Sequence, residues 1–179
     1  MKNFLRELGS ADPTPGGGAA AAMTGALGAA LLEMVSRLNK DTASAQKAAR
    51  MKARFQTLMQ KDARAFKKVY ALYKKKTSCC SPAYQRALQG AAAAPGEICM
   101  LAVEGAALAL SQKKKTSRWL ISDLKESAIL FKACFESARL NVNVNLEGFH
   151  DKGEAKKVDA YLNKKYEELI KSGGKVFRG

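Results

Sequence analysis

PTPGGGAAAAMTGALGAALLEMVSRL, residues 13–38, is a run of small side chains that leads into a more apolar helix pattern. Glycine inside a helix costs about 1 kcal/mol relative to alanine. Gly25 and Gly28 therefore indicate that close approach of a neighbouring backbone compensates this cost. We expect a helix over 17–38 that other helices surround, within the subunit or across a dimer interface.

The turn PTPGGG before this helix has three interpretations: a flexible linker, a tight turn, or the floor of a ligand site. An intimately packed helix follows at once, which argues against a linker. Pro15 restricts the backbone, and Gly16, Gly17 and Gly18 leave the backbone N–H groups accessible. The N-terminus of a helix binds anions through such N–H groups, whereas a tight turn needs glycine only for its permissive backbone. Both of these interpretations stay open.

Helical periodicity extends over nearly the whole chain, and no stretch alternates as a strand does. We expect one domain over 1–179, an all-α bundle of five or six helices. Pro95 is expected to kink or divide the fourth helix. The expected helices cover 2–8, 17–38, 42–73, 82–111, a segment from 118 or 122 to 143, and 152–171.

The chain is strongly basic, with 31 Lys and Arg against 16 Asp and Glu, a formal net charge of +15. Such a charge favours nucleic acid, anionic lipid or a ligand with carboxylates as partner. Aromatic residues are sparse and do not alternate with the basic ones, which argues against a stacking surface for single strands. Two lysine runs, 74–76 and 113–115, are expected at helix ends.

Four cysteines and one histidine offer little metal chemistry. The cysteines show no CxxC spacing, so we expect free thiols in a reducing cytoplasm. The first residues carry acidic groups and no long apolar segment, which argues against a signal peptide. The run 19–32 is too short and too rich in alanine to predict a membrane span.

A carboxylate interrupts the apolar stripe of the third helix. Steps of three and four place Phe55, Leu58, Met59, Asp62, Ala65, Phe66, Val69 and Tyr73 on one face. A buried charge costs several kcal/mol unless it is paired. Asp62 is therefore either satisfied by a partner in the core or lines a functional cleft.

The fifth helix has an unbroken apolar stripe, with polar residues at both ends. Ser122 can cap the helix start, and Asp123 then lies at the positive end of the helix dipole. Asn141, Asn143 and Asn145 follow at the other end. Carboxamides can order a helix end or bind the edge of a heterocycle, and their spacing alone favours the capping role.

Four segments occur in an order that resembles the cyclodeaminase/cyclohydrolase family. They are residues 13–38, KDARAF (61–66), QRALQGAAAAP (85–95) and SDL…NVNVNL (122–146). This family includes the C-terminal domain of formimidoyltransferase-cyclodeaminase and the free-standing methenyltetrahydrofolate cyclohydrolases. The similarity covers nearly the whole chain, and it rests on four motifs in sequence and not on one.

The resemblance implies a helical homodimer with folate clefts between helices and subunits. It implies one of two reactions: closure of 5-formimidoyltetrahydrofolate with release of ammonia, or hydrolysis of the 5,10-methenyl bridge to 10-formyltetrahydrofolate. Neither reaction requires a metal or a cofactor beyond the folate substrate. A chain without a fused transferase slightly favours the hydrolase.

Both reactions move protons around one carbon between two nitrogens, which calls for a carboxylate in a partly dry cleft. Asp62 and Asp123 are the candidate catalytic residues, one of which can instead anchor the pterin. The resemblance implies substrate contacts from the glycine turn at Pro15, from Ser122, and from Asn141 and Asn145.

Arg86 is a further candidate contact, for the acidic and sometimes polyglutamylated folate tail, or else a surface residue or the partner of a buried acid. The family usually has serine after the three glycines, whereas this chain has Ala19. Any contact from the turn is then expected from its backbone.

An alternative function is a non-catalytic basic dimer that binds nucleic acid or another polyanion. It requires cations on one face and a strongly salt-dependent affinity. The spread of lysines along the chain favours the enzyme, without membrane or nucleic-acid binding.

Overall fold

The structure, a computed structural model, describes residues 2–178 and is all-α over that range, with no strand. The predicted helical bundle is confirmed, although the last two long helices end later than expected. The α-helices are α1 (Lys2–Leu8), α2 (Gly17–Leu38), α3 (Thr42–Lys74), α4 (Pro82–Gln112), α5 (Ile121–Glu147) and α6 (Lys152–Phe177), with a short 3-10 turn at Lys113–Lys115.

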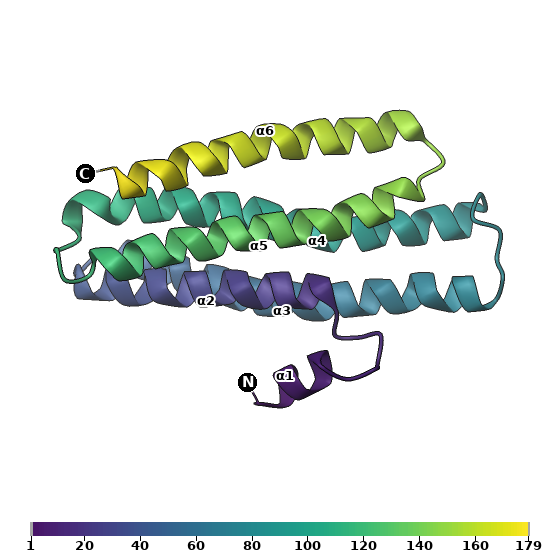
Figure 1. Cartoon of the computed structure of the whole chain (residues 1–179), viewed down its shortest axis with the longest axis horizontal. Helices are drawn as coiled ribbons and strands as arrows, with labels where there is room; N and C mark the ends of the chain where they lie inside the picture. Colours follow the sequence, from purple (N-terminus) through teal and green to yellow (C-terminus); the bar gives the residue numbers. More distant parts are fainter. Residues whose placement is uncertain (1, 179) are drawn as a thin grey trace.

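Four long helices form the centre of the molecule (Figure 1). Helix α2 packs against α3 and α5, and α4 packs against the same two helices from the opposite corner. Helix α6 covers α4 and α5, whereas α1 stands apart from the bundle and buries no residue. The core therefore lies between α2, α3, α4 and α5.

The small residues of α2 produce the predicted close packing. Gly25, Ala26, Gly28 and Ala29 are buried, although Ala30 is only half-buried. A Cβ atom at Gly25 would lie 2.5 Å from the ring of Phe55. Glycine at this position therefore lets an aromatic ring rest on the helix backbone.

Helix α4 runs through Pro95 without a break, so the expected division of this helix is wrong. Proline inside a helix removes one hydrogen bond and costs about 3 kcal/mol. Pro95 and the neighbouring Ala94 are buried, and α4 packs on the four other long helices, α2, α3, α5 and α6. This tertiary packing outweighs the local cost.

Two helices are long and apolar enough to cross a membrane by length and composition: Gly17–Leu38, and Pro82–Lys115 with its 3-10 end. The sequence argument from uncharged runs predicted no such segment. In the structure, 61% and 56% of their apolar windows are buried within the bundle. Core helices of soluble proteins pass the same test, so this feature is weak evidence for a membrane span.

The four cysteines are free thiols, as predicted. Cys79 and Cys80 are exposed in the connection between α3 and α4, whereas Cys99 and Cys134 are buried. Burial raises the pKa of the Cys99 thiol to about 12. The two buried thiols are therefore protonated core residues at neutral pH.

Helix α3 extends well beyond the start of α2. Gly18, in the first turn of α2, lies beside Asp62, and α3 continues to Lys74, about 18 Å further at 1.5 Å per residue. Phe66 and Tyr73, which the apolar stripe predicted to be buried, are 40% and 68% exposed there. The stripe leaves the core because α2 no longer covers it. We call residues 63–74 the α3 overhang.

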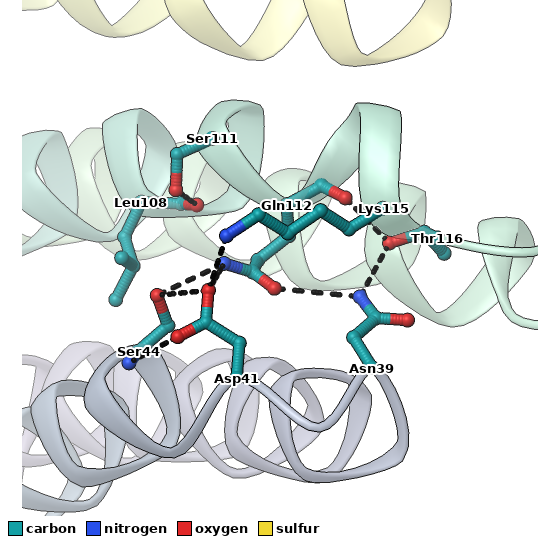
Figure 2. A network of polar contacts seen from close by, with 8 residues as sticks. All are labelled: Asn39, Asp41, Ser44, Leu108, Ser111, Gln112, Lys115 and Thr116. Carbon is teal, nitrogen blue, oxygen red and sulfur yellow. Dashed lines mark hydrogen bonds and ion pairs between the residues drawn. The ribbon is translucent and has the colours of Figure 1, made fainter.

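A polar network joins the two helix connections at the opposite end of the bundle (Figure 2). Gln112 is fully buried, and its Nε2 donates to Asp41 Oδ2 at 3.0 Å and to Ser44 Oγ at 2.9 Å. Asn39 Nδ2 donates to Thr116 Oγ1 at 2.9 Å. Lys115, followed by Gln112, holds the pKa of Asp41 far below its usual range. The network fixes the segment that leads into α5.

Replacement of Gln112 by methionine is expected to lower the free energy of unfolding by about 1–3 kcal/mol. The change keeps the side-chain length but removes the two bonds that the buried Gln112 donates, to Asp41 and to Ser44. Urea unfolding measures the effect. Gln56→Met, at an exposed position of α3, should stay within about 0.5 kcal/mol of the wild type, and equal effects of both changes would contradict the prediction.

Candidate active site

A cleft of about 350 Å³ lies where α2 begins, and α3, α4 and α5 form its other walls. We call it the Asp62 cleft. Six of the residues predicted from the sequence line it: Gly16, Gly17, Gly18, Asp62, Asn141 and Asn145. The remaining lining residues are Pro13, Thr14, Phe66, Val69, Leu88, Ala91 and Val144.

The carboxylate of Asp62 rests directly on the backbone of Gly18. A Cβ atom at Gly18 would lie 2.4 Å from Asp62 Cγ and from both carboxylate oxygens. Burial raises the pKa of Asp62, and no ion pair or side-chain hydrogen bond within residues 2–178 offsets that effect. Among the described residues, no arginine pairs with Asp62; its carboxylate lies at the N-terminal turn of α2 and lines a cleft, so features of both interpretations are present.

The first turn of α2 presents unpaired backbone N–H groups to this cleft. Gly16 is the N-cap, in an extended conformation, and it has no side chain to accept from them. The preceding Thr14–Pro15 peptide bond is cis. The first N–H groups of a helix have no partner within the helix and carry its positive dipole end. The cleft thus combines N–H donors with one carboxylate.

Asn141 and Asn145 are bound to their own helix, which continues to Glu147. Asn141 Nδ2 donates to the carbonyl of Ser137 at 2.9 Å, and Asn145 Nδ2 donates to the carbonyl of Asn141 at 2.7 Å. Both side chains thus bind the backbone of the last turns of α5, as the local structural role predicted, although neither caps the terminal carbonyls. With the amide nitrogens engaged, the Oδ1 atoms remain available as acceptors on the cleft side.

An apolar wall completes the cleft. Phe66, Val69, Leu88 and Val144 come from three helices, and the Phe66 ring stacks on Tyr70 with centroids 5.8 Å apart. The sequence analysis did not assign these residues to the site. The apolar stripe of α3 contained the signal, since Phe66 and Val69 follow Asp62 by one and two turns.

A model of the formiminotransferase-cyclodeaminase family matches residues 1–164. The chain belongs to this family. The predicted resemblance is thereby confirmed over most of the chain. A curated relative, a methenyltetrahydrofolate cyclohydrolase of Methylorubrum extorquens, is 31% identical over 175 residues, which cover 87% of this chain and 83% of the relative.

A solved structure of the same type is the formiminotetrahydrofolate cyclodeaminase of Thermotoga maritima. It matches with a TM-score of 0.92 at 26% identity, over 98% of this chain and 92% of the other. The two chains therefore share the same arrangement of helices over nearly their whole length.

Two candidate residues lie far from the Asp62 cleft within one subunit. Asp123 is in the first turn of α5 and Asn141 is near its end, about 27 Å away along the helix axis. Ser122 is exposed and does not cap α5, because the N-cap residue is Leu120 and makes no side-chain hydrogen bond. The helix begins at Ile121, two residues earlier than a cap at Ser122 requires.

Arg86 and Pro15 also lie outside the lining of the cleft. Arg86 is exposed and lies about 160° around α4 from Leu88, which faces the cleft. Pro15 is half-buried and precedes the lining residue Gly16. Within one subunit, Arg86 has no direct access to a ligand beside Asp62.

Ala19, where the family usually has serine, is only 1% exposed and is not part of the cleft lining. It faces the interior of the bundle, one residue beyond Gly18. A hydroxyl at this position would therefore contact the core and not a ligand in the cleft.

Asp62→Asn is expected to stabilise the folded protein at neutral pH. The folded-state pKa of Asp62 lies above the unfolded value of 3.8 because burial disfavours the charged form. The Asp62 carboxyl of the folded protein thus stays protonated to a higher pH than that of the unfolded chain. The wild type therefore loses stability as the pH rises from about 3.8 through the raised pKa. Asparagine carries no such penalty.

Melting temperatures of both proteins between pH 3 and pH 8 measure this effect. The advantage of the variant should grow with pH and vanish below the ordinary pKa of aspartate. A variant that is less stable than the wild type at neutral pH would show that the carboxylate has a stabilising partner.

Proposed function

We propose that this family member is a methenyltetrahydrofolate cyclohydrolase. The observation that carries the proposal is the unpaired, partly buried carboxylate of Asp62 at the N-terminus of α2, beside an aromatic wall. A planar pterin suits the wall formed by Phe66 and Val69. The name of the 31% identical relative supports the same reaction.

Asp62 acts in this proposal as general base and then as general acid. It accepts a proton from the water that attacks the methenyl carbon, and a tetrahedral adduct forms. Asp62 then returns the proton to N5 as the bond between that carbon and N5 breaks. The hydroxyl of the adduct releases its remaining proton to solvent as the C=O bond forms, which gives 10-formyltetrahydrofolate. A carboxylate whose pKa is raised by burial is suited to both steps.

The N–H groups of Gly17 and Gly18 stabilise the oxygen of the adduct. Donors at a helix N-terminus act most strongly on charge that develops during the reaction. A folate carboxylate is the weaker candidate for these N–H groups, because Asp62 already lies against Gly18 and would repel it. The glutamate tail of the folate instead lies toward the lysine-rich end of the α3 overhang.

Asn141 and Asn145 anchor the pterin in this arrangement. Their Oδ1 atoms accept from its amino group and ring N–H, because their amide nitrogens are bound to α5. Ring orientation then depends on two acceptors at successive turns of one helix.

A spectroscopic assay tests the proposed reaction. The purified protein is offered 5,10-methenyltetrahydrofolate and, separately, 5-formimidoyltetrahydrofolate, while the absorbance of the methenyl chromophore is followed. Loss of absorbance in the first reaction supports the cyclohydrolase. A gain in the second, with no loss in the first, supports the cyclodeaminase, the activity named for the structural neighbour. No change in either contradicts both, and salt-dependent binding to a polyanion is then the alternative to measure.

We further propose that the functional unit is a homodimer. Large apolar side chains remain exposed along two adjacent helices, α2 and α5, at intervals that keep them on one face of each helix. They are Leu27, Met34 and Leu38 on α2, and Ile129, Leu140 and Val144 on α5, with Val144 69% exposed. A second copy that covers both helices would bury them.

A two-fold axis across α5 would bring the separated candidates together. Ile129 and Leu140 lie on either side of the middle of the segment between Asp123 and Asn145. An antiparallel copy crossing at that point would present its own Asp123 and Ser122 to the Asp62 cleft of the first copy. One carboxylate would then come from each subunit.

Mixing of two inactive variants tests this arrangement. Asp62→Asn and Asp123→Asn dimers, exchanged by mild denaturation, should recover about a quarter of wild-type activity, because half of the dimers are mixed and each holds one unmutated site. Sedimentation velocity confirms the dimer, and Leu140→Glu should dissociate it. No recovery in a mixture that contains mixed dimers would contradict the shared site.

A further inference from the structure

Helix α3 is rich in cations and almost free of acidic residues. Residues 47–76 contain eleven Lys and Arg and a single carboxylate, Asp62, which lines the cleft. Helix α6, by contrast, mixes seven lysines with four acidic residues. A large share of the net charge of +15 is thus concentrated on α3 and the connection that follows it.

Seven of these cations form one stripe along the helix. Steps of three, four and seven residues separate them, and such steps keep side chains on one helix face. The members are Lys47, Arg50, Arg54, Lys61, Arg64 and Lys68, followed by Lys75 at the C-cap. All of them are exposed except the half-buried Lys61. At 1.5 Å per residue the row is about 42 Å long, and we call it the α3 cationic stripe.

The rest of the bundle leaves most of the α3 cationic stripe without a counter-charge. Arg54 and Lys61 both pair with Glu97 of α4. In the part of the chain that the structure describes, the other five members form no ion pair. Like charges three or four residues apart destabilise a helix. Folding alone therefore does not account for a row of one sign, whereas a polyanionic partner does.

The composition and shape of the stripe indicate the kind of polyanion. Its uncharged positions hold Thr57 and Ala71, so it contains no large apolar or aromatic side chain. Helices that bind membrane surfaces bury Trp, Phe or Leu, and proteins that bind single strands stack bases on aromatic rings. A long, narrow row of cations instead fits a stiff rod of phosphates, and double-stranded DNA carries one negative charge per about 1.7 Å of its axis. The arginine members can bind phosphate through two N–H groups each.

We propose that the α3 cationic stripe binds the phosphate backbone of double-stranded nucleic acid, without preference for base sequence. The spread of lysines along the chain argued against such a partner, but the helix gathers the cations of α3 on one face. No member of the stripe lines the Asp62 cleft. Duplex binding is therefore separate from the folate chemistry and does not depend on the proposed reaction.

Fluorescence anisotropy with a labelled DNA duplex tests the proposal. A duplex of about 24 base pairs is roughly twice as long as the stripe at 3.4 Å per base pair. Phosphate contacts by the five unpaired members predict a slope of about −4.5 in log K against log salt, a loss of about 500-fold in affinity between about 50 and 200 mM salt. An affinity that does not fall with salt would overturn the proposal. Equal or tighter binding of the single strand, or binding to phosphatidylserine vesicles without binding to the duplex, would do so as well.

A triple substitution in α3 assigns the binding to the stripe. Arg50→Gln, Arg64→Gln and Lys68→Gln together remove three exposed cations that form no ion pair. The affinity for the duplex should fall at least about tenfold, and the salt slope should become shallower by about 2.7, at about 0.9 per phosphate contact. Glutamine favours the helix about as well as lysine and arginine, so the variant should melt as the wild type does.

A triple substitution in α6 is the matched control. Lys157→Gln, Lys164→Gln and Lys171→Gln remove the same net charge from exposed positions of a helix of mixed sign. This variant should keep its affinity within about threefold and its salt slope nearly unchanged, because only the general field of the protein is weaker. Equal losses in the two folded variants would overturn the proposal, since binding would then follow net charge and not the stripe.

Discussion

Gly18→Ala will lower kcat by about a hundredfold or more while the protein stays folded. The new Cβ would lie 2.4 Å from the carboxylate of Asp62, whereas ordinary contact requires 3.4 Å or more. The carboxylate must therefore move by about 1 Å, and a displacement of that size in a catalytic group costs about 10²-fold in rate. The half-buried side chain can move toward the cleft, so the fold tolerates the change.

Steady-state kinetics on 5,10-methenyltetrahydrofolate, together with a melting curve, separate these two effects. Asp62→Asn gives the reference loss of activity, because removal of a general acid and base lowers the rate by about 10²–10⁴-fold. Gly90→Ala is the control, since its Cβ would meet no atom within 4 Å and the position lies outside the lining of the cleft. If Gly18→Ala and Gly90→Ala lose activity equally, the position of Asp62 is not the reason for glycine at 18.

Phe131→Ala is expected to lower the free energy of unfolding by about 3–5 kcal/mol. The Phe131 ring is fully buried, and its centroid lies 6.4 Å from that of Phe55. It also covers Gly105 of α4 and touches the position of Gly28 in α2. Removal of the ring therefore leaves a cavity where all four central helices meet.

A double-mutant cycle with Gly105 distinguishes this packing from a general loss of core. Gly105→Ala alone should destabilise the protein, because its Cβ would lie 2.4 Å from the Phe131 ring. In the Phe131→Ala background the same change should be neutral or stabilising, since the space is empty and alanine favours the helix. Additive effects of the two changes in urea unfolding would contradict the contact.

Periodicity was enough to predict the helices because each long helix buries a stripe of its own residues. The sequence also predicted the start of α2 at Gly17 and its end at Leu38. Pro95 is informative because it does not divide α4. Its local cost is real, but burial in a helix that packs on four other long helices outweighs it, and a single sequence does not reveal how tightly a position is packed.

Sequence spacing predicted which candidate site residues share a helix face. It did not predict where along the bundle each of these residues lies. Asp62 and the three glycines converge because α2 begins opposite the middle of α3. Asp123 shows the opposite case, since spacing in the sequence does not show that a helix start lies about 27 Å from the cleft. Arg86 is exposed on another face of α4, as its alternative interpretation as a surface residue allowed, and spacing alone does not show which face meets the cleft.

The α3 overhang has a consequence for the dynamics of the molecule. Helix segments that are packed on one side only open locally at low free energy. Amide hydrogens of residues 66–74 should therefore exchange with solvent faster than those of residues 45–58, which α2 covers. Phe66 and Val69 form one wall of the Asp62 cleft, so each local opening of this helix end also opens the cleft. We expect the rates of ligand entry and release to follow the fraying of α3, while the glycine turn stays in place.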